Sequence, residues 1–179
     1  MRVEEKPLLT GLPPLVDDRA KVLILGSFPS EMSLVKQEYY GNPQNHFWPV
    51  MEALFGVDRA ASYGERTAVL LSQGVGVWDV IGRCSREGSG DDKIKHAIAN
   101  PLTALLRDHP AIRRVFFNGG MAYRTARLLT PGVFGLPRVE CEQMPSTSPR
   151  NARMPLAAKV EAWGRIKGWL EAPQVSRCG

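Results

Sequence analysis

The residues with the clearest chemical potential follow one short apolar run early in the chain. Residues 22–25 are Val-Leu-Ile-Leu, and a loop rich in polar and aromatic side chains comes directly after them. The loop carries hydrogen-bonding Ser27, Ser30 and Asn45, and flat apolar Phe28, Tyr39, Tyr40, Phe47 and Trp48. Flat faces beside a few hydrogen-bonding groups suit a planar heteroaromatic ligand such as a nucleobase. The loop therefore predicts a site for such a ring.

A second group of small polar residues stands far along the chain, in Met144-Pro-Ser-Thr-Ser-Pro149. Its hydroxyls and backbone amides are able to hydrogen-bond to phosphate oxygens. Asp79 and Asn118 each follow an apolar run between the two groups. All of these could also be ordinary turn residues. Their function depends on whether the fold brings them together.

The apolar pattern predicts that it does. Strands separated by helices favour parallel pairing, so we expect a three-layer α/β/α fold with a central, mainly parallel four-stranded sheet. Parallel strands place their carboxyl ends at one edge, where open α/β sheets bind ligands. The expected strands are residues 22–25, 74–81, 114–117 and 139–143, and the expected helices are residues 47–55, 63–73, 94–99, 102–107, 121–129 and 156–170.

Prolines mark several expected boundaries. Pro29 should prevent an early helix, which leaves the segment before residue 47 as a long loop. Asn100 is a candidate N-cap for the helix at residues 102–107, with Pro101 at the first helical position. Residues 1–20 contain prolines and are interpreted as a lead-in to one domain that spans residues 1–179, with a short strand or loop covering the sheet edge.

Length and composition fit one core. The chain has 179 residues, of which 44% are hydrophobic. No apolar run reaches the roughly 18 to 20 residues that span a bilayer, and the N-terminus lacks the apolar segment of a secretory signal, so we expect a cytoplasmic protein. The net charge of +5 is unevenly distributed, at −2 for residues 1–100 and +7 for residues 101–179. The basic part could hold a polyanion, or it could consist of ordinary solvated helix charges.

The sequence does not indicate a metal or a cofactor. Its cysteines and histidines are widely spaced, at Cys84, Cys141, Cys178, His46, His96 and His109. This spacing supports neither a disulfide framework nor a zinc or iron–sulfur site. Gly119-Gly120 is too short for a dinucleotide fingerprint, and there is no Walker sequence. We therefore predict no metal and no cofactor.

Three motifs together resemble one enzyme family. They are Gly26-Ser-Phe-Pro-Ser-x-x-Ser-Leu34, Tyr39-Tyr-x-x-Pro-x-Asn-x-Phe-Trp48 and Met144-Pro-Ser-Thr-Ser-Pro149. Their order and spacing resemble the uracil-DNA glycosylase superfamily, and most closely its hypoxanthine-DNA glycosylase branch, which is related to the mismatch-specific uracil and thymine glycosylases. The resemblance runs from about residue 22 to about residue 169. It implies a uracil-DNA glycosylase-like fold and removal of a deaminated base from DNA.

The sequence departs from the superfamily pattern at two positions. Related members position the attacking water with an Asp or Asn one residue before the first-motif proline, where this chain has Phe28. They place His or Asn at the start of the last motif, where Met144 can neither donate a hydrogen bond nor carry charge. Asn45 is the predicted replacement for positioning water, and its alternative role is to cap the following helix. Stabilisation of the leaving group is then expected from backbone N–H groups near Ser27 and Phe28.

The resemblance also implies roles for the other residues. Phe47 resembles the aromatic residue that stacks on the extruded base, and Asp79 occupies the position that reads the base edge by accepting its N–H. Phe47 could instead be a core anchor, and Asp79 a turn residue or cap. The predicted base-binding residues are Gly26, Ser27, Phe28, Tyr40, Phe47 and Asp79. The predicted DNA-binding residues, some of which would wedge into the gap left by the flipped base, are Ser30, Ser146, Thr147, Ser148, Arg150, Asn151 and Arg153.

We therefore predict a monofunctional DNA glycosylase that removes hypoxanthine by attack of water at C1′ and so initiates base-excision repair. No lysine stands inside the motifs to form a Schiff base, which argues against lyase chemistry. The expected partner is DNA containing a deaminated or mismatched base, and the expected state is a monomer without membrane contact. Three alternatives stay open: a uracil or G:T/U mismatch-specific glycosylase, a catalytically weak nucleic-acid-binding module, and a hydrolase of free nucleosides.

Overall fold

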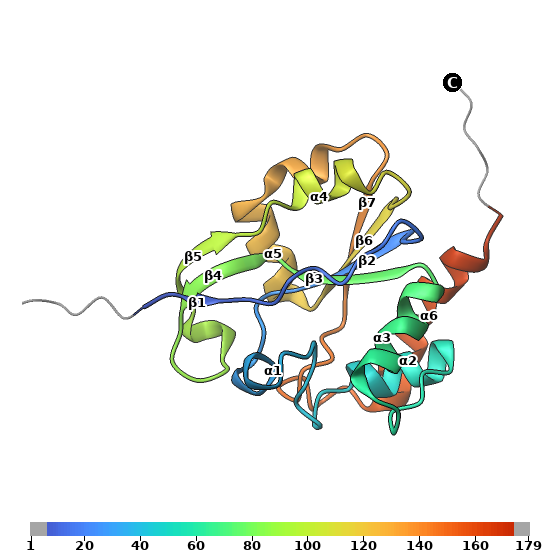
Figure 1. Ribbon diagram of the computed structural model, residues 1–179, viewed down its shortest axis with the longest axis horizontal. Coiled ribbons are helices and arrows are strands. Elements are labelled where there is room, and N and C mark those ends of the chain that lie inside the picture. The colour runs from blue at the N-terminus through green and yellow to red at the C-terminus, as the bar shows by residue number, and fades with distance from the viewer. Residues whose placement is uncertain (1–6, 174–179) are drawn as a thin grey trace, which may run out of the picture.

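The computed structural model of the protein describes residues 7–173 and contains a central four-stranded sheet (Figure 1). Its strands lie in the order β3-β2-β6-β7, and each neighbouring pair is parallel. The prediction of a mainly parallel four-stranded sheet is confirmed. Because the second strand lies inside the sheet, apolar residues 22–25 are fully buried on both faces. The strands are β2 (Val22–Gly26), β3 (Val75–Asp79), β6 (Arg114–Asn118) and β7 (Glu140–Met144).

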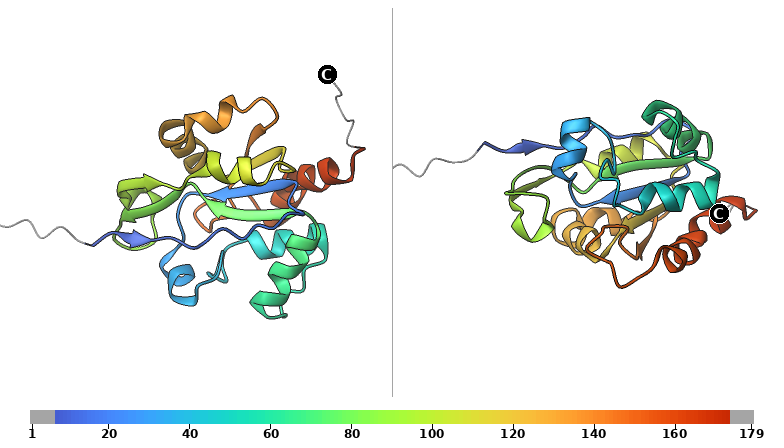
Figure 2. Two further views of the ribbon diagram at one scale, coloured as in Figure 1. Left: turned by 45° about the horizontal axis from the view of Figure 1, so that its top comes forward. Right: turned by 90° about the horizontal axis from the view of Figure 1, so that it is seen from below.

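Helices cover the sheet in two groups, which Figure 2 shows on opposite sides of it. One group comprises α2 (Phe47–Phe55), α3 (Tyr63–Ser72) and α6 (Leu156–Glu171). The other comprises α4 (Leu102–Asp108), α5 (Gly120–Leu129) and the 3-10 helix η2 (Pro131–Gly135). The three-layer arrangement agrees with the prediction. The expected helices at residues 47–55, 63–73, 102–107, 121–129 and 156–170 match the observed bounds to within one residue at each end.

A second, antiparallel sheet was not expected. It contains β1 (Leu9–Thr10), β4 (Ile81–Ser85) and β5 (Lys95–Ala99) in the order β1-β4-β5. Two predictions are wrong here. Residues 95–99 of the expected helix at 94–99 form a strand, and the expected strand at residues 74–81 is β3 followed at once by the start of β4. A segment of six residues is too short to be stable as a helix by itself. Its pairing with β4 therefore decides its conformation.

Pro29 does not prevent a helix, because α1 (Glu31–Lys36) begins just after it. Ser30 is the N-cap, and its Oγ accepts a hydrogen bond from the N–H of Ser33 at 3.1 Å. Proline costs a helix an N–H only from inside it, so the position before the cap is harmless. The predicted long loop is therefore interrupted by a short helix.

The predicted cap of α4 is also wrong. Pro101 holds the N-cap position, and the Asn100 side-chain amide donates to the carbonyl oxygen of Asp79 at 2.8 Å. Asn100 thus connects the start of α4 to the end of β3 instead of capping the N-terminus of the helix.

Residues 7–20 run beside both sheets. β1 pairs with β4, and Leu15 forms an antiparallel bridge with Val77 of β3, so this segment covers a strand edge as the lead-in was expected to do. The first six residues of the predicted lead-in lie outside the described residues, as does Cys178. Across residues 7–173 no helix has both the length and the apolar character needed to cross a membrane.

Candidate active site

One pocket of about 270 Å³ lies at the carboxyl ends of β2, β3 and β6, beside the loop that follows β7. It is lined by all the predicted site residues except Phe47, Asn151 and Arg153. The predicted convergence of distant loops therefore occurs. Further lining residues that were not predicted as site residues are Pro29, Ser33, Tyr39, Asn42, Ser89, Gly90, Asp91, Asn118 and Pro149.

The sheet register places Gly26 directly beside Asp79. A Cβ atom on Gly26 would stand only 2.5 Å from Asp79 Oδ1 and 3.3 Å from the Tyr40 hydroxyl oxygen. Only glycine leaves room for the Asp79 carboxyl at this point, so Gly26 acts by its lack of a side chain.

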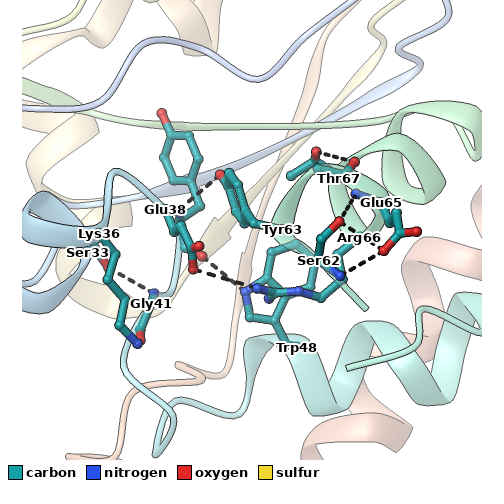
Figure 3. Close-up of polar contacts among 12 residues, drawn as sticks. Ser33, Lys36, Glu38, Gly41, Trp48, Ser62, Tyr63, Glu65, Arg66 and Thr67 are labelled. Carbon is teal, nitrogen blue, oxygen red and sulfur yellow. Dashed lines mark hydrogen bonds and ion pairs between the residues drawn. The ribbon is translucent and has the colours of Figure 1, made fainter. Parts of the chain in front are cut away.

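The loop between α1 and α2 is held by hydrogen bonds on both sides of Tyr40 (Figure 3). The Gly41 N–H donates to Ser33 Oγ at 3.0 Å, and Lys36 Nζ donates to the Gly41 carbonyl oxygen at 2.9 Å. From the first residue of α3, the Tyr63 hydroxyl accepts from the Tyr39 N–H at 3.0 Å. These bonds fix the backbone on either side of Tyr40.

Helix α3 supports this loop through Arg66, whose guanidinium lies 4.5 Å from the centroid of the Trp48 ring and 3.6 Å from the Glu38 carboxylate (Figure 3). The start of α3 is itself fixed, because Ser62 and Glu65 form a reciprocal capping box. The Trp48 indole N–H donates to the carbonyl oxygen of Tyr39 at 3.0 Å. The loop is therefore positioned by two helices before any ligand arrives.

Tyr40 supplies the aromatic face of the pocket. Its backbone has φ +54°, a left-handed conformation that is strained for tyrosine and that persists only when the surroundings enforce it. The ring stacks on Phe47 with centroids 3.9 Å apart and planes 16° apart. The Tyr40 hydroxyl is buried near Asn118 but makes no well-formed hydrogen bond to the described residues.

Phe47 lies behind Tyr40 and does not reach the pocket. Its side chain is fully buried, with edge contacts to Trp48 and Trp163 at centroid distances of 5.1 and 6.4 Å. The core-anchor interpretation of Phe47 describes its position, and of the two stacked rings only Tyr40 belongs to a residue that lines the pocket. Sequence spacing could not show this, because only the packing of the two rings decides which of them is buried and which one lines the pocket.

Asn45 lines the pocket, as predicted for a water-positioning residue. Its Oδ1 also accepts the Phe47 N–H at 2.9 Å, which serves the start of α2. An amide oxygen has two lone pairs, so one acceptor site is left after this bond. The position of Asn45 is thus compatible with both interpretations of the residue.

The loop after β7 is anchored by Thr147, which is fully buried. Asn118 Nδ2 donates to Thr147 Oγ1 at 2.8 Å, and the Thr147 N–H donates to Asn118 Oδ1 at 2.9 Å. The Thr147 carbonyl oxygen accepts the His46 N–H at 2.9 Å. With its polar groups engaged inside the protein, Thr147 holds three loops together, and its DNA-binding role stays a prediction.

The neighbouring serines shape the same loop. Ser146 Oγ accepts the Ser148 N–H at 3.1 Å, and Ser148 Oγ accepts the Arg150 N–H at 3.2 Å. Asn151 lies outside the pocket, and its side-chain amide donates to the Ser146 carbonyl oxygen at 3.0 Å. The serine oxygens accept in these bonds, so the serine O–H groups keep their ability to donate to a ligand. Arg153 is exposed beyond the pocket.

Met144 contributes nothing polar to the site. Its side chain is buried in the core, and it does not line the pocket. The polar stabiliser that the superfamily pattern has at this position is therefore missing from the site as well as from the sequence.

A further segment, which we call the acidic loop (residues 86–94), joins β4 to β5 and closes one side of the pocket. Asp91 lies in its 3-10 turn η1 (Asp91–Lys93), and Ser27 Oγ donates to Asp91 Oδ2 at 2.7 Å. Arg150 Nη1 donates to Asp92 Oδ1 at 2.7 Å. Sequence reasoning missed Asp91, because its approach to Ser27 depends on the unexpected β4–β5 pairing.

Burial dominates the electrostatics of the pocket. The Asp79 side chain is almost wholly buried, and burial, reinforced by the Asp91 charge and opposed by Arg86, raises the pKa of Asp79 to about 7. Arg86 lies over the Phe28 ring, 4.9 Å from its centroid, and donates to the Pro29 carbonyl oxygen. Burial lowers the pKa of Arg86, whose positive charge faces both aspartates.

Behind the pocket, fully buried Lys159 places its Nζ 3.2 Å from His46 Nδ1. Burial lowers the pKa of Lys159, and burial together with the Lys159 charge lowers the pKa of His46. His46 is therefore favoured as the neutral imidazole. Lys159 does not line the pocket.

The model of the family described as the uracil DNA glycosylase superfamily matches residues 13–167. The chain belongs to the uracil DNA glycosylase superfamily. The resemblance seen in the three motifs is thereby confirmed, and the pocket described above is that of a uracil DNA glycosylase superfamily member.

Individual superfamily relatives show similarity over most of the chain. A hypoxanthine DNA glycosylase of Methanosarcina acetivorans is 37% identical over 144 residues, which are 80% of this chain and 88% of that protein. A hypoxanthine DNA glycosylase of Methanosarcina barkeri is 38% identical over 110 residues, which are 61% of this chain and 70% of that protein. The solution NMR structure of a candidate uracil DNA glycosylase from Methanosarcina acetivorans superposes with a TM-score of 0.78 at 34% identity, covering 93% of this chain and all of that one.

Proposed function

We propose that the protein is a monofunctional DNA glycosylase that removes hypoxanthine from DNA by hydrolysis of the C1′–N9 bond. The observation that carries the proposal is the pocket, in which Tyr40 offers a flat face and Asp79 a buried hydrogen-bonding edge. Two relatives at 37% and 38% identity are named hypoxanthine DNA glycosylases, which supports hypoxanthine as the base.

The flipped base would enter between the strand ends with one ring face on Tyr40. Asp79 would accept the N1–H of hypoxanthine, since a carboxyl keeps an acceptor oxygen whether or not it is protonated. The N3–H of uracil is able to make the same bond, so uracil is the natural second substrate. A base without a ring N–H on this edge would lose the contact.

Asn45 would orient the attacking water through the free acceptor site on its amide oxygen. An amide is a poor proton acceptor, so it positions the water without deprotonating it. Bond breaking must then run ahead of water attack, and the sugar develops oxocarbenium character before the new C1′–O bond forms. The product is an abasic site.

DNA would be held on the loop after β7 and on the basic C-terminal part of the chain. Ser148, Pro149 and Arg150 line the pocket mouth, where a wedge would fill the gap left by the flipped nucleotide. Residues 101–179 carry a net charge of +7, which favours binding to phosphates. DNA affinity should therefore fall steeply as salt rises.

The absence of lysine among the described residues that line the pocket supports hydrolysis without strand cleavage. Lys159, the buried lysine described above, contacts His46 instead. A Schiff base with the sugar would require an amine inside the pocket.

Single-turnover assays on duplexes that contain one hypoxanthine, uracil or mispaired thymine test the proposal. We expect alkali-labile abasic sites from hypoxanthine fastest, and none from a matched duplex containing only normal bases. Tight binding without cleavage of any lesion would favour the nucleic-acid-binding module. Cleavage of free inosine with weak salt dependence would favour a nucleoside hydrolase.

We further propose that the protein acts as a monomer in the cytoplasm. The free thiols of Cys84 and Cys141 suit a reducing compartment. Light scattering coupled to size exclusion should give the mass of one chain, 19.8 kDa, for the protein alone. With a short lesion duplex added, the complex should still contain one chain. A stable dimer in the absence of DNA would contradict the monomer.

A further inference from the structure

Two aspartates line the pocket from different parts of the fold. Asp79 ends β3 of the parallel sheet, whereas Asp91 belongs to the acidic loop between the antiparallel strands β4 and β5. Asp79 is paired in register with Gly26, and the next residue, Ser27, donates a hydrogen bond to Asp91. Asn45 would position the water, and holding one base edge requires only one of these carboxyls. The presence of two carboxyls in the pocket therefore allows a further chemical role.

Asp79 is surrounded in a way that favours a proton over a charge. Its side chain is 4% exposed, and its Oδ2 has no hydrogen-bond partner among the described residues. A buried carboxyl group is unfavourable in its charged form when an oxygen lacks a hydrogen-bond donor, so these surroundings favour the protonated form. Burial first, and then the charge of Asp91, raise the pKa of Asp79 to about 7. Burial also raises the pKa of Asp91, against the hydrogen bond from Ser27.

The groups around the two carboxyls do not neutralise both of them. The phenols of Tyr39, Tyr40 and Tyr63 are uncharged at neutral pH, and burial raises the pKa of each above its ordinary value. The cations are Arg86 and Arg150, and Arg150 is already paired with Asp92. The titratable and charged groups that face Asp79 are Asp91, Arg86, Tyr39, Tyr40 and Tyr63, and those that face Asp91 are Arg86, Arg150, Asp92, Cys84 and Tyr40.

We propose that Asp79 and Asp91 share one proton, and that Asp79 passes it to the departing base as the general acid of the reaction. The inference rests on the proposed glycosylase function and deepens it. A protonated carboxyl offers an acceptor oxygen and an O–H side by side. These match the N1–H and O6 on one edge of hypoxanthine.

When the C1′–N9 bond breaks, its electron pair stays with the base, and negative charge spreads to O6. The Asp79 proton moves to O6, so the base leaves as a neutral tautomer of hypoxanthine. The water held by Asn45 forms the new bond to C1′, and the proton it loses returns to the aspartate pair. The pair thus supplies the leaving-group stabilisation that Met144 cannot provide.

The pH dependence of single-turnover cleavage tests this role. The wild-type rate should fall as pH rises through about 7, because the acid must be protonated to act. Asp79→Asn keeps a donor and an acceptor but cannot release a proton, so its rate should fall on the order of 10²-fold and lose this alkaline limb. DNA binding by Asp79→Asn should stay close to that of wild type.

Asp91→Asn removes the charge that raises the pKa of Asp79, so the alkaline limb should move to lower pH. Asp108→Asn is the matched control, because it deletes an exposed carboxylate at the end of α4 that does not line the pocket. Its pH profile should overlay that of wild type. An unchanged limb in Asp79→Asn, or a limb that does not move in Asp91→Asn, would overturn the proposal.

Carboxyl ¹³C NMR titration of the unsubstituted protein tests the shared proton without any variant and without turnover. Asp79 and Asp91 should titrate in two coupled steps, with one proton retained near neutral pH. Titration of both as ordinary aspartates, each near pH 4, would contradict the pair. If wild type cleaved no lesion while the coupled titration was present, the proposed function would fail and the pair would stand. If wild type cleaved the lesion but the alkaline limb was unchanged in Asp79→Asn and Asp91→Asn, the general-acid role of Asp79 would be rejected and the proposed function would stand.

Discussion

Tyr40 and Phe47 form a face-to-face stack, with ring centroids 3.9 Å apart, in which Phe47 is fully buried and Tyr40 faces the pocket. The order of the two rings determines which one meets a ligand. Phe47 fixes the plane of Tyr40, and the left-handed backbone of Tyr40 presents the ring to the pocket. A base that enters would therefore extend the stack by one ring.

Tyr40→Ala should remove the stacking surface. Base–aromatic stacking contributes about 1–3 kcal/mol per base. We therefore expect the single-turnover cleavage rate on hypoxanthine duplexes, at enzyme concentrations below saturation, to fall by roughly 5- to 150-fold. Tyr40→Phe is the matched control and should retain activity, because the hydroxyl makes no well-formed hydrogen bond to the described residues. Single-turnover kinetics over a range of enzyme concentrations measure both. Wild-type kinetics for Tyr40→Ala would remove the residue from the base site.

Asn45 has two roles that substitutions can separate. Asn45→Ala loses the bond to the Phe47 N–H, at a cost of about 1 kcal/mol in unfolding free energy, and also loses the water contact. Asn45→Asp keeps an acceptor for both. We expect Asn45→Ala to lower the cleavage rate on the order of 10²-fold with DNA binding largely retained, and Asn45→Asp to keep the stability of wild type. Full cleavage by Asn45→Ala would leave only the capping role.

Thr147→Val should destabilise the fold without a specific effect on DNA affinity. Loss of the hydroxyl leaves the half-buried Asn118 amide without its partner, which costs about 1–3 kcal/mol. Thr147→Ser keeps the hydroxyl and should lose less. Urea unfolding followed by circular dichroism measures both variants. A folded Thr147→Val variant of normal stability with weakened DNA binding would support the DNA-binding role predicted for Thr147 from the sequence.

Arg150 and Asp92 should have opposite effects on DNA affinity. Their ion pair is more than half exposed on both sides, so its loss should hardly change stability. Arg150→Ala should weaken binding across sequences and reduce the slope of log affinity against log salt by about one. Asp92→Asn should release Arg150 and tighten binding. Fluorescence anisotropy at several salt concentrations tests the pair, and equal effects of the two substitutions would contradict the assignment.

Several features follow from local sequence. Apolar residues 22–25 form the buried β2, and the helices that begin at Phe47, Tyr63 and Leu156 start where the pattern predicts. Such elements can be predicted from the sequence because hydrophobic periodicity and capping residues act within a few residues of each other. The three motifs also led to the superfamily, since their order and spacing resemble its pattern.

Other features depend on contacts between distant residues. Residues 95–99 became a strand because β4 pairs with them, and that hairpin carried Asp91 to Ser27. The burial of Thr147 depends on Asn118, and the position of Phe47 behind Tyr40 depends on the packing of Trp163 from α6. The sequence alone determined which chemical groups stand at the strand ends and that those ends would meet. Only the tertiary structure decided which groups face the pocket, because burial and orientation are set by neighbours that lie far away along the chain.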